Sequence, residues 1–311
     1  MEALIMEQTS MTALISLFSR AYHFEENQSN SIFADRIARS LLSDEEYAAI
    51  SENMSDGISF FNPTFIGSKD AALRWIVDNQ LSPSPLGRAA YTEELLERVI
   101  RDDGVAQYVV CAAGYDTFAY RRPDWAETVL VFELDLPQMS QDKRIRLSRA
   151  GVAIPKNTYL LEADFSFPNW KKTLAGYSEF DKSAKSFCSM LGLSYYLSET
   201  AFRTLFKELS AVLAPGSHVV FDYPDELSRT DMGGARARRQ NLLAEGAKET
   251  MQASYSRDSL RMLLSDAGFY ILENLTPQEL TERFFSDYNR KNSQHPIAAL
   301  DNVNYCLARR L

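Results

Sequence analysis

Apolar residues in the first hundred positions recur at helical spacing. They lie three or four residues apart over 14–22 and again over 32–42, which predicts amphipathic helices. Ser43 followed by Glu46 has the spacing of a capping box and predicts a helix that starts there. Helical spacing returns over 69–79 and, after the letters SPSPLG, over 88–100. We therefore expect residues 1–100 to form a helical N-terminal extension.

From residue 107 onward, short apolar runs alternate with helical segments. Strands are predicted at 107–111, 128–134, 157–162, 186–191, 217–221, 268–274 and 302–307. Helices are predicted at 137–150, 169–177, 198–213, 235–266 and 277–290. Strands that alternate with helices favour a mostly parallel sheet covered on both faces. The prediction is an α/β fold, with a Rossmann-like seven-stranded sheet in 101–311 and a helical insertion after the fifth strand at about 223–258.

Composition and charge narrow the class of protein. The 311 residues include 18 Phe, 15 Tyr and 3 Trp, enough to build a large core and to exclude disorder over most of the chain. Lys and Arg number 33 against 42 Asp and Glu, a net charge of −9, which argues against nucleic-acid partners. The basic stretches 143–149 and 236–239 are interpreted as solvated helix faces.

The sequence shows no pattern typical of a membrane helix, a secretory leader or a cysteine-based metal site. No apolar run reaches the roughly 18–20 residues of a membrane helix, and the N-terminus has no basic leader. We expect a cytoplasmic protein with no membrane partner. Cys111, Cys188 and Cys306 are too scattered for a disulfide framework or a metal site, so no metal is predicted.

Small and acidic residues follow the predicted strands, where open parallel sheets bind their ligands. Gly114 allows a tight turn after the first strand, and Asp116 comes two residues later. Glu133 and Asp135 lie about twenty residues beyond the turn, where an acid can accept hydrogen bonds from ribose hydroxyls. Their equal parity would let both face the ligand. Asp164, after the third strand, is expected at an adenine edge.

The turn over 112–117 indicates which nucleotide. It reads AAGYDT and lacks the G-x-G-x-x-G glycines that admit a pyrophosphate. The bulk of Tyr115 and Thr117, with the carboxylate of Asp116, suits a neutral or cationic ligand. S-adenosylmethionine has a ribose, an adenine, no phosphate and two positive centres. The alternative, an NAD-dependent oxidoreductase, is disfavoured by the missing third glycine and by Asp116.

Five segments together resemble a known family. They read VVCAAGYDTFAYR, VFELDLPQMSQDKR, LEADFS, MLGLSYYLSETAF and APGSHVVFDY, in that order, within roughly 85–225. They are similar to the leucine carboxyl methyltransferase family, a branch of the class I S-adenosylmethionine-dependent methyltransferases that includes protein-phosphatase and bacterial small-molecule O-methyltransferases. The resemblance implies a methyltransferase sheet, S-adenosylmethionine as cofactor, and O-methyl transfer.

The resemblance also implies roles for individual residues. Arg88 would hold the methionine carboxylate of the cofactor. The turn of Ala112, Ala113 and Gly114 would line its amino-acid and ribose portion. Asp135 would bind the ribose hydroxyls. The last role, contact with the adenine, falls to two residues, Asp164 and Phe165.

Two departures from the family pattern bear on the site. The Gly-Ala-Gly-x-Asp turn begins here with Ala112, whose methyl group is tolerated if φ is negative and crowds the ligand if φ is positive. The Glu-Gly pair after the fourth strand is Leu191-Gly192, which removes an acid that would steady the amino group of the cofactor. Asp116 or a backbone carbonyl could substitute. The second departure argues against a protein-phosphatase substrate more than it argues against S-adenosylmethionine as the cofactor.

The acceptor is expected to be a small-molecule or carrier-bound metabolite with a carboxylate or hydroxyl group. A carboxylate is ionised at neutral pH and needs no base, whereas a hydroxyl usually needs one. Candidates for a catalytic role are His23, Tyr195 and Tyr196, each supported only weakly. His218 in an apolar strand and His295 before a proline are interpreted as structural and loop residues. The lack of an obvious base favours the carboxylate.

The acceptor pocket is expected between the N-terminal segment and the 223–258 insertion. Asp231–Gly234 would give that insertion a hinge, so that it could act as a lid. A second hypothesis for the whole chain is a non-catalytic scaffold or sensor that binds S-adenosylmethionine. The departures at Ala112 and Leu191 favour that alternative.

Overall fold

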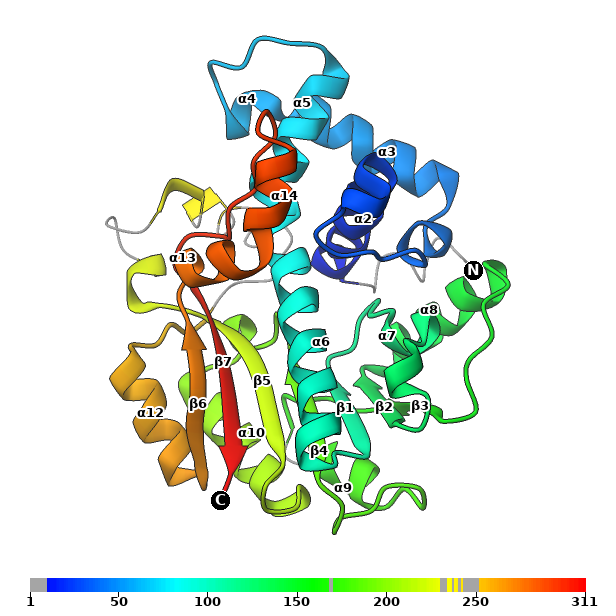
Figure 1. The fold of residues 1–311 in the computed structure, drawn as a ribbon, viewed down its shortest axis with the longest axis vertical. Coiled ribbons are helices and arrows are strands. Elements are labelled where there is room, and N and C mark those ends of the chain that lie inside the picture. Colours follow the sequence, from blue (N-terminus) through cyan, green and yellow to red (C-terminus); the bar gives the residue numbers. More distant parts are fainter. Residues whose placement is uncertain (1–9, 168–169, 230–233, 237, 240–241, 243–251) are drawn as a thin grey trace.

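The computed structural model describes residues 10–311 except 168–169, 230–233, 237, 240–241 and 243–251. An N-terminal group of helices lies above one end of a twisted sheet (Figure 1). The long helix α6 connects the two and runs along the face of the sheet.

The N-terminal part is helical throughout its described residues. Its α-helices are α2 (Met11–Asn27), α3 (Asp44–Asp56), α4 (Ile58–Phe61), α5 (Lys69–Ile76) and α6 (Pro83–Asp103). Shorter 3-10 segments are η1 (Gln28–Asn30) and η2 (Ala38–Leu41), and η3 (Val77–Leu81) is a π-helical turn. The predicted capping box is confirmed: Ser43 and Glu46 each bond the backbone N–H of the other at the start of α3.

The remainder of the chain forms the predicted seven-stranded sheet. Its strands are β1 (Gln107–Cys111), β2 (Leu130–Asp135), β3 (Thr158–Glu162), β4 (Ser186–Met190), β5 (His218–Pro224), β6 (Phe269–Leu275) and β7 (Val303–Arg310). They lie in the order β3-β2-β1-β4-β5-β7-β6, in which β7 runs antiparallel to both of its neighbours. The chain reverses its direction of travel across the sheet between β1 and β4, which creates the switch point where ligands bind in such folds.

Helices cover both faces of the sheet. They are α7 (Phe118–Arg121), α8 (Pro137–Arg149), α9 (Trp170–Ala175), α10 (Glu199–Val212), α12 (Arg257–Asp266), α13 (Pro277–Leu280) and α14 (Ser286–Lys291). Short turns are η4 (Asp124–Ala126), η5 (Ser194–Tyr196), η6 (Glu226–Arg229) and the π-turn η7 (Thr281–Phe285).

The two faces of the sheet have separate cores. Along β1, Tyr108 and Val110 join the core under α6, and Val109 and Cys111 join the core under α9, α10 and α12. Because side chains alternate along a strand, every residue of β1 is buried. The core under α6 continues without a break into α2, so the N-terminal helices pack directly on the sheet domain.

Two helical predictions differ from the structure. α6 begins at Pro83 rather than at residue 88, because prolines in the first turn of a helix lack only an N–H that has no helical partner. Within the predicted helix over 235–266, the described residues of 235–242 are helical, residues 252–256 are not, and α12 begins at Arg257. Tyr255 instead forms a bridge with Asp225 beside β5. Most of the expected hinge at Asp231–Gly234, and the centre of the 223–258 insertion, lie outside the described residues.

The interpretation of 143–149 as a solvated helix face holds for Arg144 and Arg149, which are exposed, and is wrong for Lys143 and Arg146. Lys143 and Arg146 are buried, at 2% and 4% exposure. Lys143 lies 2.7 Å from Glu133, and Arg146 pairs with Glu46 at 2.8 Å and Asp142 at 2.6 Å. The two cations point from α8 toward the sheet and the N-terminal helices, where buried carboxylates neutralise them.

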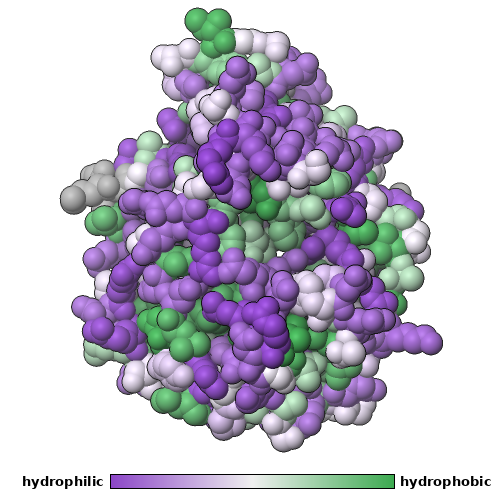
Figure 2. Space-filling model, viewed as in Figure 1, coloured by the Kyte–Doolittle hydropathy of each residue, from purple (hydrophilic) through white to green (hydrophobic). Residues whose placement is uncertain are grey.

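The surface is polar with scattered apolar patches. Hydrophilic residues dominate the face shown in Figure 2, and hydrophobic residues gather only in small separate areas. Such a distribution is ordinary for a globular domain. None of the helices described has both the length and the apolar character needed to cross a membrane.

Candidate active site

A cavity lies at the carboxyl ends of β1 and β4, at the switch point of the sheet. The atom-free space in and around it, open solvent at its mouth included, is about 710 Å³. Its floor is the segment 110–117 together with Ser189 and Leu191, and α6 contributes Arg88. Ala13, Ser16, Arg20, Phe33 and Asp35 close it from the N-terminal side. The N-terminal segment and the turn after β1 therefore meet in one site.

The turn after β1 has two residues in the left-handed region. Ala112 has φ +53° and Gly114 has φ +50°. The turn is fixed by hydrogen bonds from the Ala113 N–H to Leu134 and from the Asp116 N–H to Ala113, at 3.2 and 2.8 Å. Since φ is positive at Ala112, its methyl group meets the condition under which it crowds the ligand.

Replacing Ala112 with glycine is expected to stabilise the protein. Glycine relieves the left-handed strain but gains freedom in the unfolded chain, so we expect the free energy of unfolding to rise by about 0.5–1 kcal/mol. Urea denaturation measures the change. Ala113→Gly is the matched control: Ala113 is buried with no positive φ, and its variant should be less stable by about 1 kcal/mol. A loss of stability in Ala112→Gly as well would show that the left-handed alanine is unstrained.

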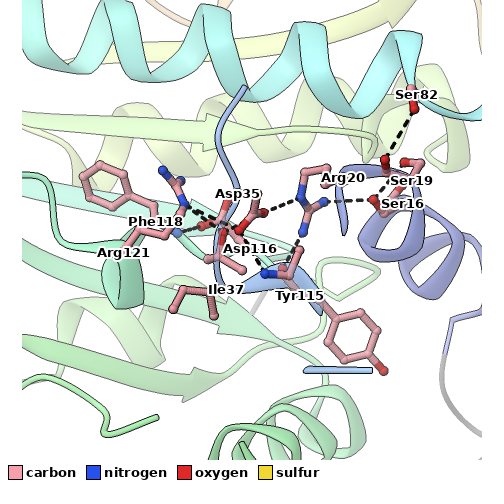
Figure 3. Close-up of polar contacts among 12 residues, drawn as sticks. Ser16, Ser19, Arg20, Asp35, Ile37, Ser82, Tyr115, Asp116, Phe118 and Arg121 are labelled. Carbon is pink, nitrogen blue, oxygen red and sulfur yellow. Dashed lines mark hydrogen bonds and ion pairs between the residues drawn. The ribbon is translucent and has the colours of Figure 1, made fainter. Parts of the chain in front are cut away.

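A buried carboxylate ties the N-terminal segment to this turn. Asp35 is fully buried and accepts hydrogen bonds from Arg20 Nε and Thr117 Oγ1, both at 2.8 Å. Arg20 also donates from Nη2 to the Tyr115 carbonyl at 2.7 Å. Figure 3 shows Arg20 and Arg121 on either side of Asp35. Burial raises the pKa of Asp35, but the two guanidinium groups outweigh it and hold the pKa below its ordinary value.

Three arginines line the cavity, and they differ in their free donors. Every nitrogen of Arg20 has a partner, in Asp35, Ser16 or Tyr115. Every nitrogen of Arg121 likewise has one, in Thr117 or Glu93.

Arg88 differs from the other two, because one of its donor nitrogens has no partner among the described residues. Its Nε and Nη2 both lie 2.6 Å from Oδ2 of Asp222, whereas Nη1 has no hydrogen-bond partner among the residues described. The Arg88 side chain is 19% exposed, and it forms part of the cavity wall. A free guanidinium donor in that wall can bind an anionic ligand group.

The other expected cofactor residues, Asp135, Asp164 and Phe165, are not part of the cavity wall as described. Asp135 is partly buried at the end of β2 and accepts the Gly114 N–H at 2.6 Å and the Leu136 N–H at 2.7 Å. Burial raises its pKa. Asp164 and Phe165 follow β3, are partly buried, and do not line the described cavity.

The structure brings Glu133 into the core rather than to the ligand side. Its carboxylate pairs with Lys143 and accepts a hydrogen bond from Tyr120 at 2.9 Å. The side chain is 2% exposed and is absent from the cavity wall as described. Glu133 and Asp135 are two residues apart on β2 and were expected to face the ligand together. They differ because Asp135 is the last residue of the strand and its carboxylate accepts the Gly114 N–H, whereas the Glu133 carboxylate lies in the core.

The expected catalytic candidates are likewise not part of the described cavity wall. His23 is buried, accepts the Ile32 N–H at Nε2, and has a pKa lowered by burial to about 3. His218 is buried in β5, and burial lowers its pKa to about 4. Tyr195 is buried and donates to Asp222 at 2.7 Å, and Tyr196 is half-buried beside it.

Comparison with known proteins decides the family. A sequence model of leucine carboxyl methyltransferases matches residues 13–210. The chain belongs to this family. In Bacillus subtilis, the protein named "Putative S-adenosyl-L-methionine-dependent methyltransferase YktD" is 35% identical over 306 residues, which cover 96% of this chain and 97% of that one. A Mycolicibacterium smegmatis relative with the same kind of name is 35% identical over 159 residues, 51% of each chain.

Solved structures agree with the fold. A methyltransferase-titled structure from Thermobifida fusca has a TM-score of 0.54 at 13% identity and covers 98% of this chain and 96% of its own. A structure from Streptomyces avermitilis, described as a duf574 family protein, has a TM-score of 0.57 at 13% identity and covers 91% of this chain and 97% of its own. The leucine carboxyl methyltransferase fold predicted from the motifs is confirmed.

This family member is an S-adenosylmethionine-dependent methyltransferase. The residues present fit the cofactor: the cavity wall has the guanidinium of Arg88 and a turn with two left-handed residues, and the carboxylate of Asp135, which is not part of that wall as described, accepts the Gly114 N–H of the same turn. S-adenosylmethionine supplies a methyl group on a sulfonium. Among the residues described, no cluster of His, Cys, Asp or Glu could hold a metal ion.

Several residues around the cavity were missed by sequence reasoning. Asp35, Arg20 and Arg121 come from segments far apart in the chain, and no spacing rule links them. Asp35 is the single acid in IFADRIARSLL, and nothing in that segment indicates that Arg20 and Arg121 are its partners. Asp222 follows the apolar run of β5 as Asp135 follows that of β2, and the same reasoning could have found it.

Proposed function

We propose that this methyltransferase transfers the methyl group to a carboxylate oxygen of a small-molecule or carrier-bound acid. The observation that carries the proposal is the lack of a suitable base. No histidine or lysine lines the cavity in the part of the chain that the structure describes. Asp35, a carboxylate in the wall, is held ionised by two arginines, with its pKa below the ordinary value. A carboxylate acceptor needs no deprotonation.

We further propose how the chain holds its cofactor. Arg88 offers its free nitrogen to the methionine carboxylate, and the turn 112–114 runs along the amino-acid and ribose portion. Asp135 uses the lone pairs left over from its two backbone bonds to accept the ribose hydroxyls. Asp164 and Phe165 contact the adenine from the end of β3.

The amino group of the cofactor needs an acceptor in place of the missing acid at Leu191. Asp116 lines the same cavity as Leu191. One of its oxygens accepts the Phe118 N–H at 2.8 Å, and the other has no hydrogen-bond partner among the described residues. We assign the amino group to that second oxygen.

The acceptor reaches the cavity from the N-terminal side. That wall includes three uncharged residues, Ala13, Ser16 and Phe33. A wall of mixed polar and apolar side chains suits an organic acid. In this proposal, residues 1–100 form the extension that binds the acceptor, apart from Arg88, which joins the core of 101–311 in binding the cofactor. The main contribution of the enzyme is alignment of acceptor and methyl group, which alone can supply many orders of magnitude in rate.

Methyl transfer to a carboxylate can be recognised from its product. The protein is incubated with methyl-labelled S-adenosylmethionine and panels of small carboxylic acids, acids carried on a thioester, and phenols. We expect labelled products that release methanol in mild alkali, because methyl esters hydrolyse there and methyl ethers do not. Calorimetry with S-adenosylhomocysteine on the same preparation shows that the cofactor site is intact.

The other outcomes separate the alternatives. Alkali-stable products from phenols would replace the carboxylate with a hydroxyl acceptor and require a base outside the described cavity wall. Tight binding of S-adenosylhomocysteine with no transfer to any acceptor in the panels would favour the non-catalytic scaffold. His23→Ala serves as a control in the first case. The buried His23 ring bonds Asn27 and the Ile32 backbone N–H and is not part of the cavity wall as described, so its loss should not affect transfer in folded protein.

A further inference from the structure

Asp222 is a buried carboxylate that joins several segments around the cavity. It lies near the end of β5 and is fully buried. Its Oδ2 accepts hydrogen bonds from Arg88 Nε at 2.6 Å and from the Tyr195 hydroxyl at 2.7 Å. Its Oδ1 accepts the Gly192 N–H at 2.7 Å. Helix α6, the turn after β4 and η5 therefore converge on one side chain.

Arg88 is held from more than one side at this point. Asp222 takes up Nε and Nη2, and the ring of Tyr195 lies 5.5 Å from the guanidinium carbon. On another side, Gly192 has φ +70°, and a Cβ built there would lie 2.9 Å from Nη1. The guanidinium thus occupies space that any residue other than glycine at 192 would take.

We propose that Asp222 is a positioning residue, which fixes the Arg88 guanidinium so that Nη1 remains directed to the methionine carboxylate of S-adenosylmethionine. The inference rests on the cofactor role proposed above for Arg88. A free arginine side chain has many rotamers, and fixing it in advance lowers the cost of binding. Asp222 and Arg88 also depend on each other, because a buried charge without its partner is strongly unfavourable.

The proposal predicts a loss that depends on the amino-acid part of the ligand. S-adenosylhomocysteine and methylthioadenosine share the adenosine and the sulfur, but only the first has the carboxylate. In calorimetric titrations, Asp222→Asn should bind S-adenosylhomocysteine about tenfold more weakly. Without the Asp222 carboxylate, the Arg88 guanidinium is no longer directed to the carboxylate of the ligand, and the hydrogen bond between these two charged groups is weakened. Its affinity for methylthioadenosine should stay within about twofold of the wild type.

Ser194→Ala is the matched control. The Ser194 hydroxyl donates to the backbone carbonyl of Asp222 at 2.6 Å in the same buried region. Its loss removes a hydrogen bond to Asp222 without touching the carboxylate that holds Arg88. Both ligands should bind this variant as they bind the wild type.

A double-mutant cycle separates this inference from the role of Arg88. Arg88→Ala should weaken S-adenosylhomocysteine by about 10- to 100-fold, and adding Asp222→Asn should weaken it no further. If Asp222→Asn lost affinity equally for both ligands, or if the double variant bound S-adenosylhomocysteine more weakly than Arg88→Ala, the positioning role of Asp222 would be wrong and the proposed role of Arg88 would stand. Full affinity in Arg88→Ala refutes the role of Arg88 and, with it, the inference.

Gly192→Ala tests the same point without removing a buried charge, in case Asp222→Asn does not fold. The added Cβ displaces Nη1 from the opposite side. It should weaken S-adenosylhomocysteine but not methylthioadenosine, and the effect should vanish when Arg88→Ala is already present. A loss that persists in the Arg88→Ala background contradicts the proposal, because the added methyl would then act on the ligand directly.

Discussion

Asp35→Asn is expected to lower the free energy of unfolding by about 3 kcal/mol or more, since it removes the common partner of two largely buried arginines. Asp35 is fully buried between Arg20 and Arg121, and it also accepts the Thr117 hydroxyl. An asparagine can keep a hydrogen bond, but it leaves the Arg20 guanidinium without a neutralising charge among the described residues, and it leaves Arg121 with Glu93 as its remaining described counter-ion. Chemical denaturation of the two proteins measures the difference.

The pH dependence of this difference has a defined sign. The folded-state pKa of Asp35 lies below its ordinary value, so the stabilisation is complete above about pH 4, where an unfolded aspartate ionises. It is lost as the pH falls through the lower pKa of the folded state. The gap between wild type and Asp35→Asn should therefore be constant near neutral pH and should narrow in acid.

Asp44→Asn is the matched control for Asp35. Asp44 also pairs with an arginine, Arg39, but its side chain is 89% exposed. An exposed ion pair contributes about 0–1 kcal/mol, so this variant should remain close to the wild type at every pH. If Asp35→Asn were destabilised no more than Asp44→Asn, the buried pair would not be what attaches the N-terminal segment to the cofactor turn.

Local pattern was sufficient to predict the strands of the sheet. β1 was predicted at its observed bounds, because QYVVC is a short apolar run that ends at a turn. The capping box at Ser43 was found for the same reason: both partners lie within one helical turn. The start of α6 was predicted too late because of the prolines in SPSPLG, since proline breaks a helix in its interior but is tolerated in its first turn.

Burial of charge could not be predicted from local pattern. Lys143 and Arg146 belong to a basic run, and sequence alone gives no indication that carboxylates from β2 and α3 meet them. Glu133 has the parity of Asp135, yet it pairs with Lys143 while Asp135 reaches Gly114. In each case the deciding contact joins segments that are distant in the chain or belong to different layers of the fold.

The features around the cavity differ in the same way. The turn 112–116 and the acid at 135 are signalled by their positions after strands. Asp35 and Asp222 act through arginines on α2, α6 and the segment after β1, so their importance depends on the assembled fold. Sequence alone therefore indicates the expected cofactor-contacting residues better than the residues that hold the site in shape.

Asp135→Asn is expected to weaken S-adenosylhomocysteine by about 10- to 100-fold, the value of one or two hydrogen bonds to a charged group. The carboxylate has about four lone-pair sites. Two accept the backbone N–H groups of Gly114 and Leu136, which leaves two for the ribose hydroxyls. An amide has one acceptor oxygen and one donor nitrogen, so it loses acceptors and places N–H against N–H. Calorimetry at neutral pH measures the affinity.

Glu162→Gln is the control for Asp135→Asn. Glu162 lies opposite Asp135 in the register of β2 and β3, but it is exposed. It changes the same charge at the same end of the sheet, so a general electrostatic effect on the cofactor would appear in both variants. We expect full affinity in Glu162→Gln. The 2′-deoxy analogue of S-adenosylhomocysteine completes the argument: it should bind the wild type more weakly and should lose less than the parent ligand in Asp135→Asn. Equal losses for the two ligands would mean that Asp135 acts by shaping the Gly114 turn, and that the ribose is held elsewhere.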